Sequence, residues 1–163
     1  MTVSVNVDSR VVPAGSDEYV EDAWELKERI RERENVLKQR WDFFSDAYRR
    51  STVHCIVHEH DDESLVGFVT VRRDGYILFL GVDPDCQGRG IGKRLVSAVA
   101  TDHRSVTCHA RTTNENALQF YEHLGFEITR RIENYYEDGG DAYYLKLTSD
   151  AGLTDRLSEF VPR

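Results

Sequence analysis

The sequence predicts an α/β domain with a mixed, mostly antiparallel sheet flanked by helices. Runs typical of strands follow one another between residues 52 and 82 with short polar turns between them, which indicates an antiparallel meander. After residue 88, helical and strand-like patterns alternate instead. The chain has 163 residues and 40% hydrophobic content, enough for a globular core. We therefore expect residues 1–163 to form a single domain.

The N-terminal third predicts one strand and a long helical region. Residues 3–12 (VSVNVDSRVV) alternate between apolar and polar side chains and end before Pro13. Residues 16–50 carry an apolar stripe among charges, with Ser16 as the candidate N-cap and acidic residues in the first turn. A change of pattern at residues 34–35 predicts a bend. We therefore expect two extended N-terminal helices.

Strand-like and helical patterns share the rest of the chain. The expected strands are residues 52–60, 64–73, 75–82, 105–111, 126–132 and 141–148. The expected helices are residues 89–101, residues 115–124 and a short helix near 153–160, within a C-terminal helix or tail of residues 150–163. Asn114 is the candidate N-cap of the helix over 115–124, and Gly125 is the residue expected to end it.

Composition limits the kinds of partner. The formal net charge of −8 and pI of about 5.2 weigh against a broad basic surface for nucleic acid. No segment approaches the roughly 18 apolar residues of a membrane span, and the N-terminus lacks a signal-peptide pattern, so we expect a cytoplasmic protein without a membrane partner. Cys55, Cys86 and Cys108 show neither CxxC spacing nor a pairing pattern. We expect reduced thiols and no metal site.

A glycine-rich stretch, DPDCQGRGIGKRL at residues 83–95, lies between an apolar run and an expected helix. Glycines let backbone N–H groups approach a ligand, and a helix N-terminus adds partial positive charge, so the stretch is typical of a pyrophosphate site. A P-loop would need glycine in place of Gln87 and Ser or Thr in place of Arg94. A dinucleotide fingerprint would need glycine in place of Lys93. Both interpretations fail, and a tight turn without a ligand is the remaining alternative to pyrophosphate binding.

The pattern Q-x-x-G-x-G at Gln87, Gly90 and Gly92 resembles the acyl-CoA pyrophosphate loop of the GNAT acetyltransferase superfamily. A second stretch, NENALQFYEHLGFE at residues 114–127, resembles that superfamily's motif N-x-x-A-x-x-F/L-Y-x-x-x-G-F. The resemblance covers residues 50–148. It implies the GNAT fold and acetyl-CoA as co-substrate.

The resemblance also implies where acetyl-CoA binds. The pyrophosphate would lie on the loop and the start of the next helix, at Gln87, Gly88, Arg89, Gly90, Ile91, Gly92 and Lys93. The pantetheine amides would pair with a strand edge and one side chain, at Leu80, Gly81, Val82 and Asn114. In this superfamily a splayed strand leaves a backbone N–H, here that of Val82, to polarise the thioester carbonyl.

The C-terminal part is similar to the end of the protein N-terminal acetyltransferases, which include the bacterial ribosomal-protein-alanine (RimI-like) enzymes. The shared element is a Tyr-Tyr pair before a glycine turn and an Asp-Ala-Tyr strand, here Tyr135, Tyr136 and residues 141–143. This implies that Tyr135 and Tyr136 bind the acceptor peptide. The alternative is that both tyrosines only cover the edge of the core. The helices expected over residues 16–50 are longer than that group's first helix, which leaves the shape of the acceptor groove open.

The same resemblance implies catalytic side chains. Tyr121 stands where the superfamily keeps the tyrosine that protonates the departing thiolate. His109 stands twelve residues before Tyr121, where the bacterial alanine enzyme has a glutamate base and a eukaryotic branch, which acetylates methionine-initiated N-termini, has a histidine. That branch also has a tyrosine eleven residues before the loop glutamine, here Tyr76. Alternation puts His109 on the strand face opposite Cys108. The alternatives are a core aromatic at Tyr121 and a hydrogen-bonded edge histidine at His109.

We predict an enzyme that transfers acetyl from acetyl-CoA to the N-terminal α-amino group of a protein or peptide. An α-amine with a pKa near 8 costs only about 1.4 kcal/mol to deprotonate at pH 7, whereas a lysine costs about 4.6 kcal/mol, and a single histidine base suits the former. The rival functions are a lysine or small-amine N-acetyltransferase on the same fold and a non-catalytic acyl-CoA-sensing module.

Overall fold

The computed structural model describes residues 7–59 and 64–148, so the helix expected near residues 153–160 lies outside the described residues. The helices are α1 (Val20–Glu34), α2 (Trp41–Arg50), α3 (Ile91–Asp102) and α4 (Glu115–Leu124), with a short 3-10 helix, η1 (Pro84–Cys86). The strands are β1 (Val7–Val12), β2 (Thr52–His58), β3 (Leu65–Val71), β4 (Ile77–Val82), β5 (Ser105–Arg111), β6 (Glu127–Ile132) and β7 (Ala142–Thr148). The predicted mixed α/β class is confirmed.

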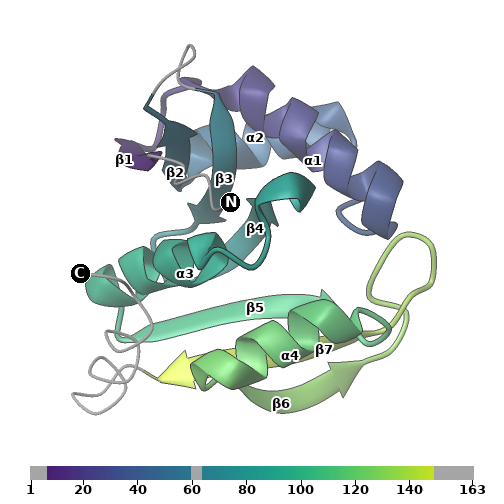
Figure 1. Cartoon of the computed structure of the whole chain (residues 1–163). Helices are drawn as coiled ribbons and strands as arrows, with labels where there is room; N and C mark the ends of the chain where they lie inside the picture. The colour runs from purple at the N-terminus through teal and green to yellow at the C-terminus, as the bar shows by residue number, and fades with distance from the viewer. Residues whose placement is uncertain (1–6, 60–63, 149–163) are drawn as a thin grey trace.

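Two antiparallel sheets form the centre of the fold, with the strand orders β1-β2-β3-β4 and β5-β7-β6 (Figure 1). They meet where β4 begins. Tyr76 forms a parallel bridge with Thr107, and the Thr107 N–H donates to the Gly75 carbonyl over 3.1 Å. Beyond this bridge the described residues of β4 and β5 form no further ladder, so a wedge opens between two neighbouring strands.

Helices cover both faces of the first sheet because its strands carry apolar side chains on both faces. On one face, Phe44 of α2 packs against Phe68 and Phe79, in a core that also includes α1. On the other face, α3 packs in a second core that includes Val96, and α4 and the second sheet, which carries Leu145, contribute to the same core. Strand β3 is buried along its whole length between these cores. Since β4 pairs with β3, the wall of the wedge that β4 forms is rigidly supported.

The N-terminal helical region differs from the prediction at its start. Ser16 is not the N-cap of α1, because its hydroxyl accepts from the Glu18 N–H over 3.2 Å and closes a local turn before the helix. The residue that caps α1 is Tyr19, in a left-handed conformation at φ 64°. The predicted bend is confirmed at Asn35, which ends α1 at φ 58°. Residues 35–40 then form the α1–α2 loop, next to the wedge.

No helix in the described part of the chain is both long and apolar enough to cross a membrane.

Candidate active site

A cavity of about 490 Å³ occupies the wedge between β4 and β5. Its sides come from the end of α1, the α1–α2 loop, the starts of α3 and α4, and the loop between β6 and β7. We call the part next to residues 86–93 the glycine end. The part next to Tyr76, His109, Tyr135 and Tyr136 is the tyrosine end. Segments that are far apart in the sequence therefore contribute to one cavity.

The glycine end is shaped by backbone. Gly88 and Gly90 have left-handed conformations, φ 83° and 78°, and a side chain added at either would meet nothing within 4 Å. The left-handed turn requires glycine, and the open space lets a ligand touch the main chain. Gly90 is the N-cap of α3, so the helix begins at Ile91, slightly later than predicted. The first turn of α3 has no acidic residue and carries Lys93, which leaves the positive end of the helix suited to an anion.

Most of the residues predicted to hold acetyl-CoA line this cavity. They are Leu80, Gly81, Val82, Gln87, Gly88, Gly90, Ile91, Gly92, Lys93, Asn114 and Tyr121. Arg89 is not part of the lining. Ile91 is 6% exposed and its side chain belongs to the core, so its backbone is the part available to a ligand. A Cβ on Gly92 would approach the Phe120 ring at 3.0 Å, so close packing of α3 and α4 explains this glycine.

Helix α1 holds the glycine loop through polar contacts. The Gln87 Nε2 donates to Glu34 Oε1 over 3.1 Å. The Gln87 side chain, which was predicted to bind pyrophosphate, is therefore hydrogen-bonded to α1. Two ion pairs run along the same helix, Arg29 with Asp83 at 2.8 Å and Arg33 with Asp85 at 3.3 Å. The loop is therefore positioned before any ligand binds.

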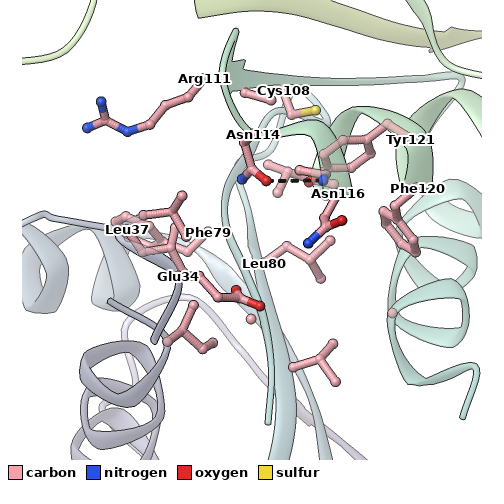
Figure 2. Close-up of a pocket in the computed structure, with 18 of the residues that line it drawn as sticks. Glu34, Leu37, Phe79, Leu80, Cys108, Arg111, Asn114, Asn116, Phe120 and Tyr121 are labelled. Carbon is pink, nitrogen blue, oxygen red and sulfur yellow. Dashed lines mark hydrogen bonds between the residues drawn. The ribbon is translucent and has the colours of Figure 1, made fainter. Parts of the chain in front are cut away.

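Asn114 caps α4 and also faces the cavity. Its Oδ1 accepts from the Ala117 N–H over 3.2 Å, which confirms the predicted N-cap. Figure 2 shows this bond as a dashed line, with the amide nitrogen turned away from the helix and toward the cavity. Glu34 and Leu37 face the cavity from the opposite side (Figure 2). The Asn114 amide nitrogen is thus placed to donate to a carbonyl group of a ligand.

The tyrosine end brings together three residues predicted from separate motifs. The Tyr76 hydroxyl lies 2.5 Å from His109 Nδ1, and the Tyr135 hydroxyl lies 3.3 Å from the same nitrogen. The two hydroxyls are 3.4 Å apart. The rings of His109 and Tyr135 are stacked, with centroids 4.3 Å apart. The bridge between Tyr76 and Thr107 sets the distance between β4 and β5 at the start of the wedge. It therefore also sets the positions of the Tyr76 and His109 side chains relative to each other.

The surroundings keep His109 neutral and Tyr76 protonated. Burial lowers the pKa of His109, and the nearby charge of Arg130 lowers it further. Burial also raises the pKa of the Tyr76 phenol well above its ordinary value. At neutral pH, His109 therefore offers a nitrogen lone pair next to a hydroxyl that keeps its proton, which is the state that a general base needs.

Tyr121 belongs to the core and to the cavity wall at once. It is 7% exposed and packs against Phe120 and Phe126, with ring centroids 5.2 and 5.0 Å away. Its hydroxyl interacts with the Cys108 thiol, and burial raises the pKa of Tyr121 well above its ordinary value. Burial also raises the pKa of Cys108 to about 12, so both groups stay protonated. Tyr121 therefore has a proton to give and is a poor base.

Sequence reasoning missed several residues of the tyrosine end. Val36, Leu37 and Phe43 give it an apolar side, and the break between the two N-terminal helices was the one signal for them. Arg111 was also missed, although it lies two residues after His109 and so on the same strand face. Its guanidinium lies 4.0 Å from the centroid of the Tyr136 ring. Within residues 7–59 and 64–148, no group of three or more His, Cys, Asp or Glu is arranged to hold a metal.

A model of a known protein family matches most of the chain. The model of the acetyltransferase (GNAT) family matches residues 17–126, which include the glycine loop and most of the second motif.

Three curated proteins illustrate the similarity. N-alpha-acetyltransferase 30 from Xenopus laevis is 41% identical over 80 residues, which are 46% of this chain and 29% of that protein. N-alpha-acetyltransferase RimI from Mycobacterium tuberculosis is 35% identical over 96 residues, 53% of this chain and 61% of that protein. Peptidyl-lysine N-acetyltransferase YjaB from Salmonella typhimurium is 32% identical over 114 residues, 64% of this chain and 77% of that protein. The chain thus spans less than a third of the Xenopus relative.

A solved structure agrees in fold. A chain in the crystal structure of the NatC complex bound to Gag peptide and CoA superposes with a TM-score of 0.69 at 20% identity, covering 88% of this chain and 99% of that chain. The similarity confirms the predicted fold.

Proposed function

The chain belongs to the acetyltransferase (GNAT) family, and we propose that it transfers the acetyl group of acetyl-CoA to the N-terminal α-amino group of a protein or peptide. The observation that carries this proposal is the cluster of Tyr76, His109 and Tyr135 in the same cavity as the glycine loop. Acyl transfer from a CoA thioester to an amine needs a base at one end of the site and a pyrophosphate cradle at the other. The names of two relatives, N-alpha-acetyltransferase 30 and RimI, support the α-amine as acceptor.

Acetyl-CoA fits the glycine end of the cavity. The open space beside Gly88 and Gly90 and the N-terminus of α3 suit the pyrophosphate. The edge of β4 at residues 80–82, which β5 does not pair, and the Asn114 amide suit the pantetheine amides. When bound, acetyl-CoA supplies an activated acetyl group on a thioester.

The side chains then divide the proton transfers. His109 takes a proton from the incoming ammonium through a water, and Tyr76 extends the hydrogen-bonded path. The free amine attacks the acetyl carbon while the Val82 N–H stabilises negative charge on the carbonyl oxygen. As the C–S bond breaks, Tyr121 donates its proton to the departing thiolate. After the attack the acceptor nitrogen also loses a second proton, which replaces the one that Tyr121 gives to the thiolate. His109 releases the first proton to solvent, so the protons balance over the cycle.

A lysine acceptor is the second candidate, and the relationship to the peptidyl-lysine N-acetyltransferase YjaB favours it. The chemistry of the tyrosine end favours the α-amine. A histidine with a lowered pKa is a weak base, and a lysine costs about 3 kcal/mol more than an α-amine to deprotonate at neutral pH. We therefore keep the α-amine as the proposed acceptor.

We also propose that residues 1–163 act as a single domain in the cytoplasm, with a protein or peptide as partner and no nucleic-acid or membrane partner. Cys55, Cys86 and Cys108 are all free and buried, which supports a reducing compartment. The net charge of −8 supports the exclusion of nucleic acid.

The test is to incubate the protein with acetyl-CoA and a peptide library and to identify acetylated positions by mass spectrometry. We expect acetyl groups on α-amines. Modification confined to lysine side chains or small amines would replace the proposal with the second candidate. Tight acetyl-CoA binding without CoA release for any amine would indicate a non-catalytic sensor.

A further inference from the structure

The α1–α2 loop is held in an unfavourable backbone conformation beside the cavity. Leu37 has a φ of 54°, a left-handed conformation that is sterically unfavourable for a non-glycine residue. Its side chain faces the cavity in Figure 2. Such strain persists where surrounding contacts over-determine the conformation, and it concentrates at functional sites. The contacts that hold this loop are therefore informative about function.

Two lysines connect the loop to different parts of the molecule. Lys27 of α1 is fully buried, and its ammonium donates to the Gln39 carbonyl. The Nζ of Lys38 lies 3.0 Å from Asp138 Oδ2 in the loop between β6 and β7. The first contact ties the loop to the helix before it. The second ties it to a segment 100 residues away.

Asp138 continues the second contact to β5. Its Oδ1 accepts from Arg111 Nη1 over 3.0 Å and from the Gly140 N–H over 3.0 Å. The Arg111 guanidinium holds the pKa of Asp138 well below its usual range, so the carboxylate is charged at any physiological pH. A Cβ on Gly140 would come within 2.6 Å of Arg111 Nη1, so a side chain there would displace the guanidinium from its present position. Lys38, Asp138 and Arg111 together form what we call the ionic bridge.

The ionic bridge spans the rim of the tyrosine end. The cavity is lined by Leu37, which precedes Lys38, by Arg111 and by Tyr136, which is two residues before Asp138. Lys38 and Asp138 themselves lie outside the lining. Figure 1 shows the β6–β7 loop extending up to the end of α1, away from its own sheet. The bridge thus joins the two loops that face each other across the entrance for an acceptor.

We propose that the ionic bridge of Lys38, Asp138 and Arg111 determines acceptor specificity by holding Leu37 and Tyr136 at a fixed separation. This inference rests on the proposed function, because it assumes that an amine acceptor enters at the tyrosine end. Lys38 and Asp138 are positioning residues. Breaking the bridge frees both loops, which must then be ordered by each acceptor that binds. The cost falls on acceptor binding, while the glycine end keeps its own contacts to α1.

The experiment compares Lys38→Met and Asp138→Asn with two controls. Lys38→Arg keeps the charge, and Asp46→Asn removes the exposed pair with Arg50 on α2, away from the cavity. We expect the acceptor KM to rise about 3-fold for Lys38→Met, since a partly exposed ion pair contributes only modestly. Asp138→Asn loses both ionic arms, and we expect about 10-fold. The acetyl-CoA KM should stay within about 2-fold, and both controls should match the parent protein.

Two further measurements separate the loss of the ionic bridge from general damage to the protein. Raising the salt from about 0.05 M to about 0.5 M should raise the acceptor KM of the parent protein and leave that of Asp138→Asn nearly constant, because salt screens partly exposed pairs. Hydrogen–deuterium exchange of the protein without substrates should increase at residues 35–40 and 133–140 in Lys38→Met. Equal changes in both KM values, or unchanged exchange in these two loops, would overturn the inference.

Failure of the proposed function gives a different result. If the parent protein acetylates lysines or small amines and no peptide N-terminus, the proposed function falls. The same KM comparison is then made with the amine that it does acetylate. If the parent protein acetylates no amine, hydrogen–deuterium exchange still tests the ionic bridge. Unchanged exchange in the variants would show that the bridge does not hold the two loops. Increased exchange would show that it holds them, but without an acceptor its proposed role in specificity would be wrong.

Discussion

The two ends of the cavity differ in the groups that they present to a ligand, which are mainly backbone at the glycine end and side chains at the tyrosine end. The pyrophosphate cradle of the glycine end comes from one short segment, residues 86–93, and presents mainly backbone to a ligand. The tyrosine end comes from the α1–α2 loop, the start of β4, β5 and the β6–β7 loop, and presents side chains. Binding by backbone groups is altered by substitutions that change the conformation of the main chain. The function of a side-chain cluster is altered by substitutions that remove individual side-chain atoms. Substitutions at the two ends should therefore alter different kinetic constants.

The largest effect is expected at the tyrosine end, at His109. His109→Ala removes the proposed base, and positioned acid–base groups contribute about 10²- to 10⁴-fold, so kcat/KM should fall by about that factor. His58→Ala on β2, outside the cavity, is the control. Activity assays with a peptide acceptor measure the difference. Turnover near that of the parent protein would leave orientation of an already neutral amine as the main source of catalysis.

The pH dependence of kcat/KM gives a second test of His109, because the direction of its pKa shift is known. Burial and Arg130 lower the pKa of His109, so the base loses its activating lone pair as the pH falls through a value below the ordinary 6.5. The acid limb of kcat/KM should accordingly lie below pH 6.5 and disappear in His109→Ala, while the titration of the acceptor near pH 8 remains. An acid limb that survives the substitution would belong to another group.

The next largest effect is expected at the glycine end. Gly90→Val forces a β-branched side chain onto a backbone at φ 78° and fills the space proposed for the pyrophosphate. The backbone penalty alone, about 1–2 kcal/mol, corresponds to about 5- to 30-fold, so acetyl-CoA affinity should fall by more than 30-fold in calorimetry. Gly15→Val is the matched control, because Gly15 is also left-handed, at φ 96°, with open space around it. Unchanged acetyl-CoA affinity in Gly90→Val would show that this loop is not part of the binding site.

A smaller effect should distinguish the two loop tyrosines. Tyr135 stacks on His109, whereas Tyr136 lies under the Arg111 guanidinium at the rim. We expect Tyr135→Ala to lower kcat by about 10-fold, since a stacked aromatic pair contributes about 0.5–1.5 kcal/mol, and Tyr136→Ala mainly to raise the acceptor KM. Steady-state kinetics with both substrates varied provide the measurement. Identical effects of the two substitutions would indicate that the tyrosines only cover the edge of the core.

The sequence was most informative where local chemistry decides the structure. The limits of both β5 and α4 match the prediction. For α4 the reason is that Asn114 caps the helix through its own side chain and Gly125 ends it in a left-handed conformation, φ 104°. The glycine loop was found for the same reason, since its conformation depends on the residues within it. Ser16 failed as a cap because a nearby N–H competes for the same hydroxyl.

The tyrosine end was predicted in part. The offsets that single out Tyr76 and His109 came from a resemblance, and the distance of 2.5 Å between their polar atoms arises from the bridge between two strands. The pairing of Lys38 with Asp138 leaves no trace in local pattern, because both are ordinary charged residues in loops. Contacts of this kind depend on how the whole chain folds, and sequence reasoning on one chain cannot find them.

The smallest expected effect tests whether the tyrosine end also depends on the buried contact of its loop. Lys27→Met keeps an unbranched chain of similar length beside Trp24, and Glu28 retains its pair with Arg31 at 2.7 Å. The Gln39 carbonyl loses its donor, which should lower the free energy of unfolding by about 1 kcal/mol and the Tm by about 2–4 °C.

Because Lys38 still holds the loop from outside, the acceptor KM in Lys27→Met should rise by about 2-fold, less than in Lys38→Met, with the acetyl-CoA KM unchanged. Combining Lys27→Met with Lys38→Met removes both contacts and should raise the acceptor KM by more than the product of the single effects, since each lysine limits the same backbone strain at Leu37. Thermal unfolding and two-substrate kinetics on the single and double variants measure these terms. Strictly multiplicative effects would mean that the two lysines act on separate features and that the strained loop is not the element they share.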